Sequence, residues 1–329
     1  MMPFYRRIIT DAWKIAWTHK YLWVFGFFTA LVGFGGITEV LFNTNDRVSQ
    51  LVVSILSHES PFKLIPGFTT LRAVLSFSSS PILATTIFII IAGLLLAVFF
   101  WIATTSIGAL IHNVRKIELG GEPTFGDGMK VGMQAFWKIL ALNLMTKFVI
   151  IVTALITGCN LFILIQHQTL TSAFFYVGSF VIFTGVAVIA SIITVFASNY
   201  VILKNETIMR AIVKGGQLFA EHWLINLEMS IALFVVSIAI GLLAALFALI
   251  LSVPVIFLFL ITIALKASGL VAPLLTLTTI GCILIIVLFA SFVTTFEITS
   301  WTLLWGEMTE NKPMAKLHRL VHHLTSFMK

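Results

Sequence analysis

Long runs of apolar residues, separated by short polar stretches, follow one another between residues 21 and 305. The hydrocarbon core of a bilayer is about 30 Å thick, so a helix needs roughly 20 apolar residues to cross it. Six runs reach that length, and the sequence therefore predicts an all-α, polytopic membrane protein with about six transmembrane helices. The predicted spans are residues 21–42, 82–112, 137–165, 174–203, a run that begins near residue 223, and residues 273–305.

The fifth run, residues 224–265, is too long for one ordinary span. As a helix it would extend roughly 63 Å. Pro254 lies inside the run and is expected to kink or break the helix near Ser252 and Val253, because proline lacks the backbone N–H. Two alternatives stay open: one long span that continues into a short buried or re-entrant piece, or two tight spans. The placement of charges favours the first alternative.

Basic residues are unevenly distributed over the polar segments that six spans would leave on the two sides of a membrane. Of the 20 Lys and Arg residues, 15 fall on one side and four on the other, while Lys147 lies within a span. Seven of the eight tryptophans also fall at span ends on the basic side, where indole rings prefer the headgroup layer. The positive-inside rule therefore predicts that both termini are cytoplasmic. Residues 1–329 then form a single integral membrane domain, with residues 43–81 as an extracytoplasmic connection.

A basic amphipathic segment precedes three of the predicted spans. In the first, residues 4–20, an apolar stripe contains Ile8 and Ala12, and the other face carries Arg7 and Lys14. The pattern predicts helices in the cytoplasmic interface, each followed by a hairpin of spans. Whether the chain is a true threefold repeat, or only shares a need for basic, tryptophan-bearing helices, stays open. The segments that align without gaps, and in which a lysine coincides, are residues 13–23, 129–139 and 213–223.

Two local signals add detail to this plan. Thr124 is followed three residues later by Asp127, which is the spacing of a helix N-cap, so the second amphipathic helix is predicted to start there. At the other end of the chain, residues 306–329 are predicted to form a cytoplasmic amphipathic tail. In this tail an apolar stripe lies opposite basic side chains such as Lys316 and Arg319.

The composition supports the membrane class and excludes several others. Apolar residues make up 59% of the chain and charged residues 10%, whereas soluble domains average about 45–50% and 25%. A water-soluble fold of this length cannot bury so much apolar surface. This excludes a soluble enzyme, a disordered chain and a disulfide-rich module. In a soluble protein the net charge of +7 would suggest nucleic acid as a partner. Here the excess lies on the predicted cytoplasmic side, so we expect anionic lipid headgroups as partners and no nucleic acid.

Four groups of short motifs accompany the predicted helices. They are residues 12–14 (AWK) with 21–27 (YLWVFGF), 121–125 (GEPTF), 211–216 (AIVKGG) and 299–305 (TSWTLLW). Together they resemble a group of bacterial six-span proteins that is similar to the membrane domain fused to some glycerophosphodiester phosphodiesterases. The resemblance covers most of the chain, and it implies this architecture and a bacterial plasma membrane. It carries over no catalytic residue, because the phosphodiesterase chemistry belongs to a separate soluble barrel.

Ionisable side chains within the spans are the first candidates for chemistry, because burying them is costly. Lys147, Glu228 and Glu297 are such residues, and Asn143 and Asn226 lie nearby. All five could meet in the cytoplasmic half of the bundle. One hypothesis is a polar cavity used for proton or substrate coupling. The alternative, which we favour, is a structural ion pair together with a glutamate that snorkels toward the interface.

No cofactor or metal site is predicted from the sequence. His318, His322 and His323 lack a cysteine or carboxylate that would complete a ligand set, so we interpret them as a polar face near headgroups. We expect a non-enzymatic plasma-membrane protein that organises the membrane or supports a partner, either another membrane protein or a second copy. The alternative is a small transporter or lipid-handling protein whose path passes the predicted polar cluster.

Overall fold

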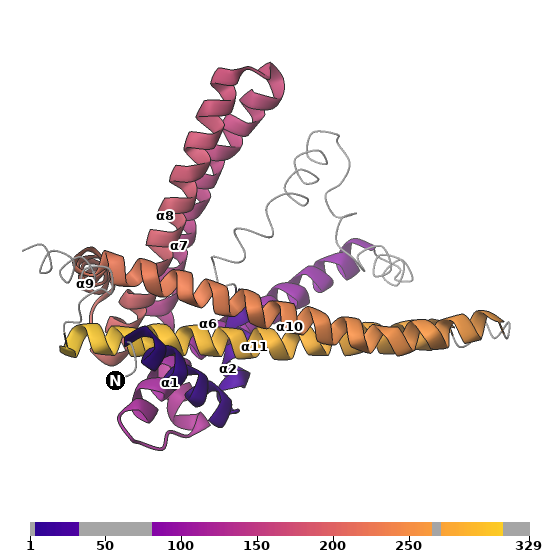
Figure 1. Cartoon of the computed structure of the whole chain (residues 1–329), viewed down its shortest axis with the longest axis horizontal. Coiled ribbons are helices and arrows are strands. Elements are labelled where there is room, and N and C mark those ends of the chain that lie inside the picture. Colours follow the sequence, from indigo (N-terminus) through magenta and orange to yellow (C-terminus); the bar gives the residue numbers. More distant parts are fainter. Residues whose placement is uncertain (1–3, 33–80, 265–270, 312–329) are drawn as a thin grey trace, which may run out of the picture. The chain divides into compact units, whose positions relative to one another are not determined.

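The computed structural model describes residues 4–32, 81–264 and 271–311, and within these ranges every regular element is an α-helix (Figure 1). The all-α prediction is therefore confirmed. The chain divides into two compact units. The smaller unit is Gly35–Ala103, which includes the first part of α6, and the larger unit contains the rest of α6 and all the other described helices. The helices are α1 Phe4–Thr18, α2 Leu22–Val32, α6 Pro81–Glu118, α7 Phe125–His167, α8 Leu170–Leu203, α9 Ile208–Glu221, α10 Trp223–Ala264 and α11 Val271–Asn311.

Five helices in the described part of the chain are long and apolar enough to cross a membrane. They are Gly93–Glu118, Phe125–His167, Leu170–Leu203, Trp223–Leu258 and Leu284–Glu310, and they match the second to sixth predicted spans. Within the first predicted span, residues 21–42, the structure describes the helix Leu22–Val32. The rest of that span lies outside the described residues, as does almost all of the predicted connection 43–81. A multi-pass membrane protein is thus supported, and the count of six spans stays a prediction.

Helix α10 runs without interruption through Pro254, so of the predicted kink or break near Ser252 and Val253 the break is wrong, and the kink stays a prediction. Proline removes one backbone N–H, but a helix that ended there would leave several more backbone groups without partners in an apolar medium. Ser252, two residues before the proline, donates a hydrogen bond from its Oγ to Leu249 O at 2.7 Å. The continuous helix also excludes two tight spans in this run, because no turn separates them.

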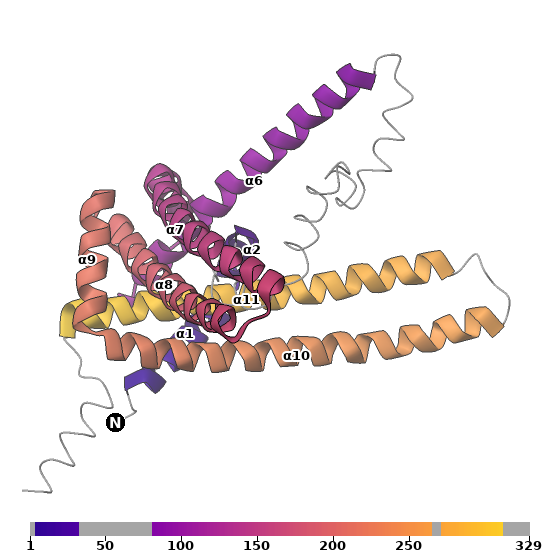
Figure 2. The ribbon, with the colours of Figure 1, turned by 90° about the horizontal axis from the view of Figure 1, so that it is seen from above.

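Helices α10 and α11 lie side by side and antiparallel (Figure 2). Ser237 of α10 meets Glu297 of α11, and ten residues further along α10 the ring of Phe247 lies 5.9 Å from that of Phe289. Positions therefore rise along one helix as they fall along the other. Helix α11 also contacts α1, α2 and α8, which makes it the helix on which much of the larger unit is assembled.

The turn between α7 and α8 is shorter than the polar stretch of residues 166–173, which separates the third and fourth predicted spans. Only Gln168 and Thr169 separate the two helices. Gln168 adopts the left-handed conformation with a φ of 45°, and the side chain of Thr169 accepts a hydrogen bond from the backbone N–H of Ser172. Because caps of this kind satisfy the free backbone groups at a helix end, the polar residues on both sides of the turn join the helices.

Small residues allow the helices of the larger unit to approach closely. At the crossing of α6 and α7, a Cβ added to Gly132 would lie 2.2 Å from the backbone oxygen of Thr105. At the crossing of α2 and α11, a Cβ on Gly26 would lie 2.1 Å from Thr295 Oγ1. Such contacts are typical of membrane helices, which associate through close packing and polar contacts because lipid tails are as apolar as the side chains.

Each of the three predicted amphipathic segments is helical and buries two small residues spaced four apart. We call these segments the lead helices: α1, the first turns of α7, and α9. The first packs against α11, the second against α6 and the third against α8. The predicted N-cap at Thr124 with Asp127 is confirmed as a capping box at the start of α7. The buried pairs are Ala12 with Ala16, Gly128 with Gly132, and Ala211 with Gly215.

Candidate functional site

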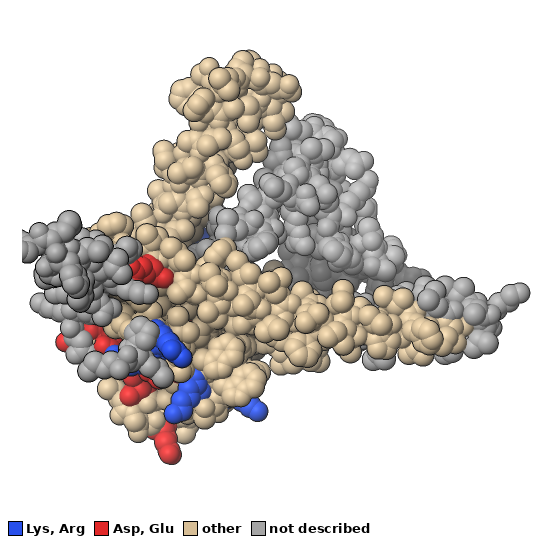
Figure 3. All heavy atoms as spheres, in the orientation of Figure 1, with Lys and Arg blue, Asp and Glu red and all other residues tan. Residues whose placement is uncertain are grey.

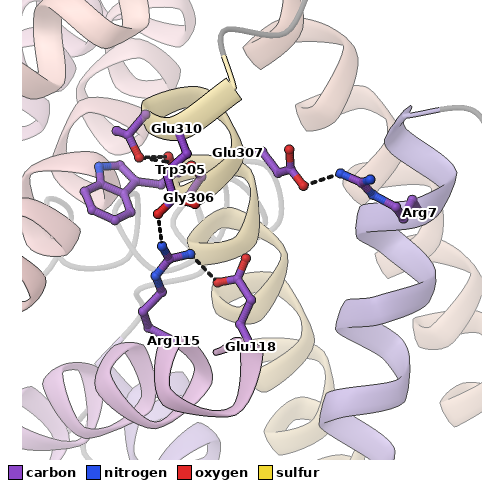
Figure 4. Close-up of polar contacts among 8 residues, drawn as sticks. Arg7, Arg115, Glu118, Trp305, Gly306, Glu307 and Glu310 are labelled. Carbon is purple, nitrogen blue, oxygen red and sulfur yellow. Dashed lines mark hydrogen bonds and ion pairs between the residues drawn. The ribbon is translucent and has the colours of Figure 1, made fainter. Parts of the chain in front are cut away.

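Charged side chains gather around α1 and the C-terminal end of α11 (Figure 3). Arg7 of α1 forms an ion pair with Glu307 of α11, and Arg115 of α6 forms one with Glu310 of α11 (Figure 4). Arg115 also pairs with Glu118 on its own helix. We refer to these five residues as the charged layer. They connect three helices whose charged ends the sequence predicts to lie on one side of the membrane.

Arg115 is the centre of the charged layer. Its Nη1 donates to Glu118 Oε2 at 2.6 Å, while its Nη2 donates to Glu310 Oε1 across the gap to α11. Only 13% of the arginine side chain is exposed. Gly306 makes room for the guanidinium, because a Cβ at that position would lie 2.5 Å from Nη1. Arginine suits this position because its planar group directs several N–H donors toward separate carboxylates at once.

Helix α7 makes two further polar contacts with neighbouring segments. Lys116 Nζ of α6 lies 3.0 Å from Asp127 Oδ2 in the first turn of α7. Further along α7, Lys138 Nζ donates to Asn205 Oδ1 at 2.9 Å. Asn205 lies in the connection between α8 and α9. The first contact thus joins the end of α6 to the start of α7, and the second joins α7 to the connection between α8 and α9.

The third lead helix is held by its own ion pair, between Lys214 of α9 and Glu206 of the preceding connection. The hydrogen bond from Lys214 is the main reason why the pKa of Glu206 lies below its usual range. A carboxylate whose pKa is lowered by folding stabilises the folded state above its unfolded-state pKa. That contribution is lost as the pH falls through the lowered value, so this contact weakens only under acidic conditions.

A cavity of about 400 Å³ lies between α1, α6 and α11, beside the Arg7–Glu307 ion pair. Asp11 and Lys14 line it from α1, and Glu118 lines it from α6. Basic and acidic groups therefore border the same space. Its apolar lining is formed by Ile8, Ile15, Ile117 and Leu303.

Asp11 and Lys14 differ from the other charged residues of this cavity. Arg7, Glu118 and Glu307 are each held in an ion pair. Within the described part of the chain, no ion pair holds the carboxylate of Asp11 or the ammonium group of Lys14. The two residues are three positions apart, so they lie on the same face of α1. The cavity thus offers one group of each sign that can bind a ligand.

Glu297, from the predicted polar cluster, lies at the interface of α10 and α11. Its Oε1 accepts a hydrogen bond from Ser237 Oγ at 2.7 Å. Glu297 is ten residues before Glu307, which places it roughly 15 Å from the charged layer along α11. The sequence does not predict this role for Ser237, because Glu297 reaches it only when α10 and α11 pair.

The other residues of the predicted cluster lie on α7 and α10. Asn143 donates to a backbone oxygen of its own helix at 3.1 Å, and the fully buried Asn226 donates to a backbone oxygen of α9 at 3.5 Å. Lys147 is exposed on α7, and Glu228 is half-buried on α10, with its Oε2 atom buried. The contacts described here do not test whether these residues and Glu297 form one cluster, which therefore stays a prediction.

The cavity beside α1 was not predicted from the sequence. The available signal was the recurrence of opposite charges at helix ends, which indicates ion pairing but not a cavity. The first residues of the predicted tail 306–329 belong to α11, and the remainder, with its three histidines, lies outside the described residues. Within the described ranges, no group of three or more His, Cys, Asp or Glu side chains is arranged to hold a metal ion.

Comparison with known proteins gives no assignment. No family model matches the chain, and neither a curated protein nor a solved structure matches it. Any functional conclusion therefore depends on the residues and contacts described above.

Proposed function

We propose that this chain is a non-enzymatic, multi-pass protein of a bacterial plasma membrane, with six spans and both termini in the cytoplasm. The observation that carries the proposal is the charged layer, which joins the ends of α1, α6 and α11 through Arg7, Arg115 and their partners. Helices that cross a membrane keep their charges at the interface, and an excess of basic residues marks the cytoplasmic side.

In this proposal the lead helices lie in the cytoplasmic headgroup region. Helix α1 exposes the stacked rings of Trp13 and Trp17, which are 41% and 55% exposed, while Arg6 and Lys14 are exposed elsewhere on the helix. Indole rings and basic side chains are the groups that hold a helix in an interface with anionic lipid.

We further propose that the chain consists of three units, each made of a lead helix and a hairpin of spans. The packing of the lead helices supports this, because each packs on the last long helix of the preceding unit and α1 packs on the last helix of all. In the alignment that superposes Lys14 on Lys130, the buried pairs of α1 and α7 coincide. In the alignment that superposes Lys14 on Lys214, the buried pair of α9 falls one position earlier.

The role that fits this arrangement is organisation of the membrane or support of a membrane-protein partner, including a second copy of the chain. Ion pairs hold the helix ends in fixed positions, while neighbouring basic groups such as Arg6, Lys20 and Lys130 remain exposed to headgroups. Clustered basic groups near a membrane surface attract anionic lipid.

The test is to extract the protein from expressing cells in native-membrane nanodiscs and to identify the lipids and proteins that accompany it. We expect enrichment of a lipid class or of one membrane protein over the bulk membrane. Cysteines introduced at Gln168 and Asn205 should react with an impermeant reagent from opposite sides of the membrane. Labelling of both positions from one side, or discs of bulk composition, would contradict the proposal.

A second candidate function is a small transporter or lipid-handling protein that uses Lys147, Glu228 and Glu297. The hydrogen bond between Ser237 and Glu297 favours it, because a carboxyl group that deep in a span is costly and often functional. Proteoliposomes with an internal pH dye would show a proton or solute flux that Glu297→Gln abolishes. If unmodified protein produces no flux with any tested gradient, this candidate is wrong.

A further inference from the structure

We propose that the cavity between α1, α6 and α11 binds a zwitterion that carries both a phosphate and a primary ammonium group, the chemistry of phosphoethanolamine. The inference rests on the proposed function for the position of the cavity at the membrane surface. The lining residues of the cavity determine which chemical groups it can bind.

The ammonium group would bind to carboxylates. Asp11 lines the cavity without an ion-pair partner in the described part of the chain, and Glu118 and Glu307 line it from the two facing helices. A primary ammonium carries three N–H donors, so it can reach more than one of these carboxylates through charge-assisted hydrogen bonds. A trimethylated ammonium has no N–H and would lose these bonds.

The phosphate would bind to the basic side of the same cavity. Lys14 is the lining cation that no ion pair holds among the described residues, Arg7 lies beside it, and Thr18 contributes a hydroxyl donor to the lining. Lys14 and Asp11 are one helical turn apart on α1, so a ligand with two opposite charges close together can reach both. Both groups then gain an opposite charge as a neighbour.

The balance of charges in the lining excludes simpler ligands. Three carboxylates face the cavity together with the two permanent cations, so a plain anion would be repelled by the acidic side. A plain amine would be attracted by the carboxylates, but it would leave Lys14 without an opposite charge. A zwitterion satisfies both sides, and when its phosphate is a diester, as in a lipid, it also leaves the net charge of the cavity unchanged.

The size and the position of the cavity fit this ligand. A volume of about 400 Å³ lies within the range of small-molecule sites, which is about 300–1,000 Å³. Apolar side chains such as Ile15 and Leu303 can contact the carbon chain that joins the charges. On the same helix, Trp13 and Trp17 mark the headgroup level, where lipids carry this zwitterion.

The zwitterion can come from a membrane lipid or from solution, and the experiment separates the two sources. Full-length protein in detergent micelles is mixed with equal amounts of phosphatidylethanolamine, phosphatidylcholine and phosphatidylglycerol, and native mass spectrometry counts the lipids that are retained. In a second arm, calorimetry measures binding of soluble O-phosphoethanolamine, with phosphocholine as the methylated control. The second arm needs no bilayer, so it tests the cavity even if the proposed membrane function fails.

We expect phosphatidylethanolamine to be retained in preference to the other two lipids. Loss of one charge-assisted hydrogen bond costs about tenfold in affinity or more, so Asp11→Asn and Lys14→Gln should each weaken binding by at least that factor. The matched control is Glu122→Gln with Lys204→Gln, which removes one exposed charge of each sign outside the cavity. Binding to this control variant should be unchanged.

Retention of phosphatidylethanolamine supports a lipid source, and binding of O-phosphoethanolamine without lipid retention supports a soluble source. Equal retention of phosphatidylglycerol would overturn the proposal, and so would equal effects of the control and cavity variants. Binding of neither probe would also overturn it. Circular dichroism of each variant shows that the helices are intact, and the changed side chains of Asp11 and Lys14 are exposed, so folding does not depend on them.

Discussion

Replacing either of two glycines of α7 with alanine should change the stability of the protein in opposite directions. A Cβ at Gly132 would lie 2.2 Å from Thr105 O and 3.1 Å from Ala109 N, both backbone atoms of α6 that can give way only if the helix moves. A Cβ at Gly158 would meet no atom within 4 Å. Both glycines lie inside the same continuous helix, so the substitutions Gly132→Ala and Gly158→Ala differ in their surroundings alone.

The expected magnitudes follow from two terms. In a helix interior, alanine is favoured over glycine by about 1 kcal/mol, and this gain applies at both positions. Overpacking costs about 1–3 kcal/mol, and the overlap with backbone at Gly132 places it near the upper end. Gly132→Ala should therefore lower the free energy of unfolding by about 2 kcal/mol, while Gly158→Ala should raise it by up to about 1 kcal/mol.

Thermal unfolding in detergent, followed by tryptophan fluorescence, measures the difference. About 3 kcal/mol between the variants corresponds to a separation in Tm of roughly 4 °C for a chain of 329 residues. Gly132→Ala should unfold below the unmodified protein, and Gly158→Ala at or slightly above it. If the two variants unfold within about 1 °C of each other, the close approach of α6 and α7 at Gly132 is refuted.

Two further predictions test individual contacts. Gly306→Ala should displace the guanidinium of Arg115, whose flexible side chain can move, and alanine is favoured in a helix by about 1 kcal/mol, so stability should change by less than about 1 kcal/mol. Thermal unfolding measures the change, and a fall in Tm as large as that of Gly132→Ala would contradict this reasoning. Ser237→Ala should cost about 1–3 kcal/mol, because it leaves the carboxyl group of Glu297 without its described donor. The control is Ser230→Ala, which removes a hydroxyl bonded only within α10 and should change stability by less; equal losses would show that the bond to Glu297 contributes nothing specific.

The sequence predicts most of the helices because membrane spans are set by a long apolar run, and caps are set by residues a few positions apart. The capping box at Thr124 is correct for this reason, and so is the gathering of charges at helix ends. Pro254 misleads because its effect depends on the medium: in water a helix readily ends there, whereas in lipid ending it costs more than bridging it.

The cavity and the hydrogen bond of Glu297 depend on contacts between distant parts of the chain. Ser237 and Glu297 are 60 residues apart, and Arg7 and Glu307 are 300 residues apart. No periodicity in a single sequence reports such pairs, because each member is an ordinary residue of its own helix. The individual charged residues are visible in the sequence, but the space that they enclose exists only after α1 has packed on α11.

That docking also has a consequence for biosynthesis. A ribosome adds about 5–20 residues per second, so the 300 residues between Arg7 and Glu307 take roughly 15 to 60 s to make. During this time α11, against which α1 packs in the finished protein with Ala12 and Ala16 fully buried, has not yet been made. Helix α1 can therefore complete its packing only after α11 has been inserted. Any factor that shields α1 during this interval would control how fast the molecule is completed.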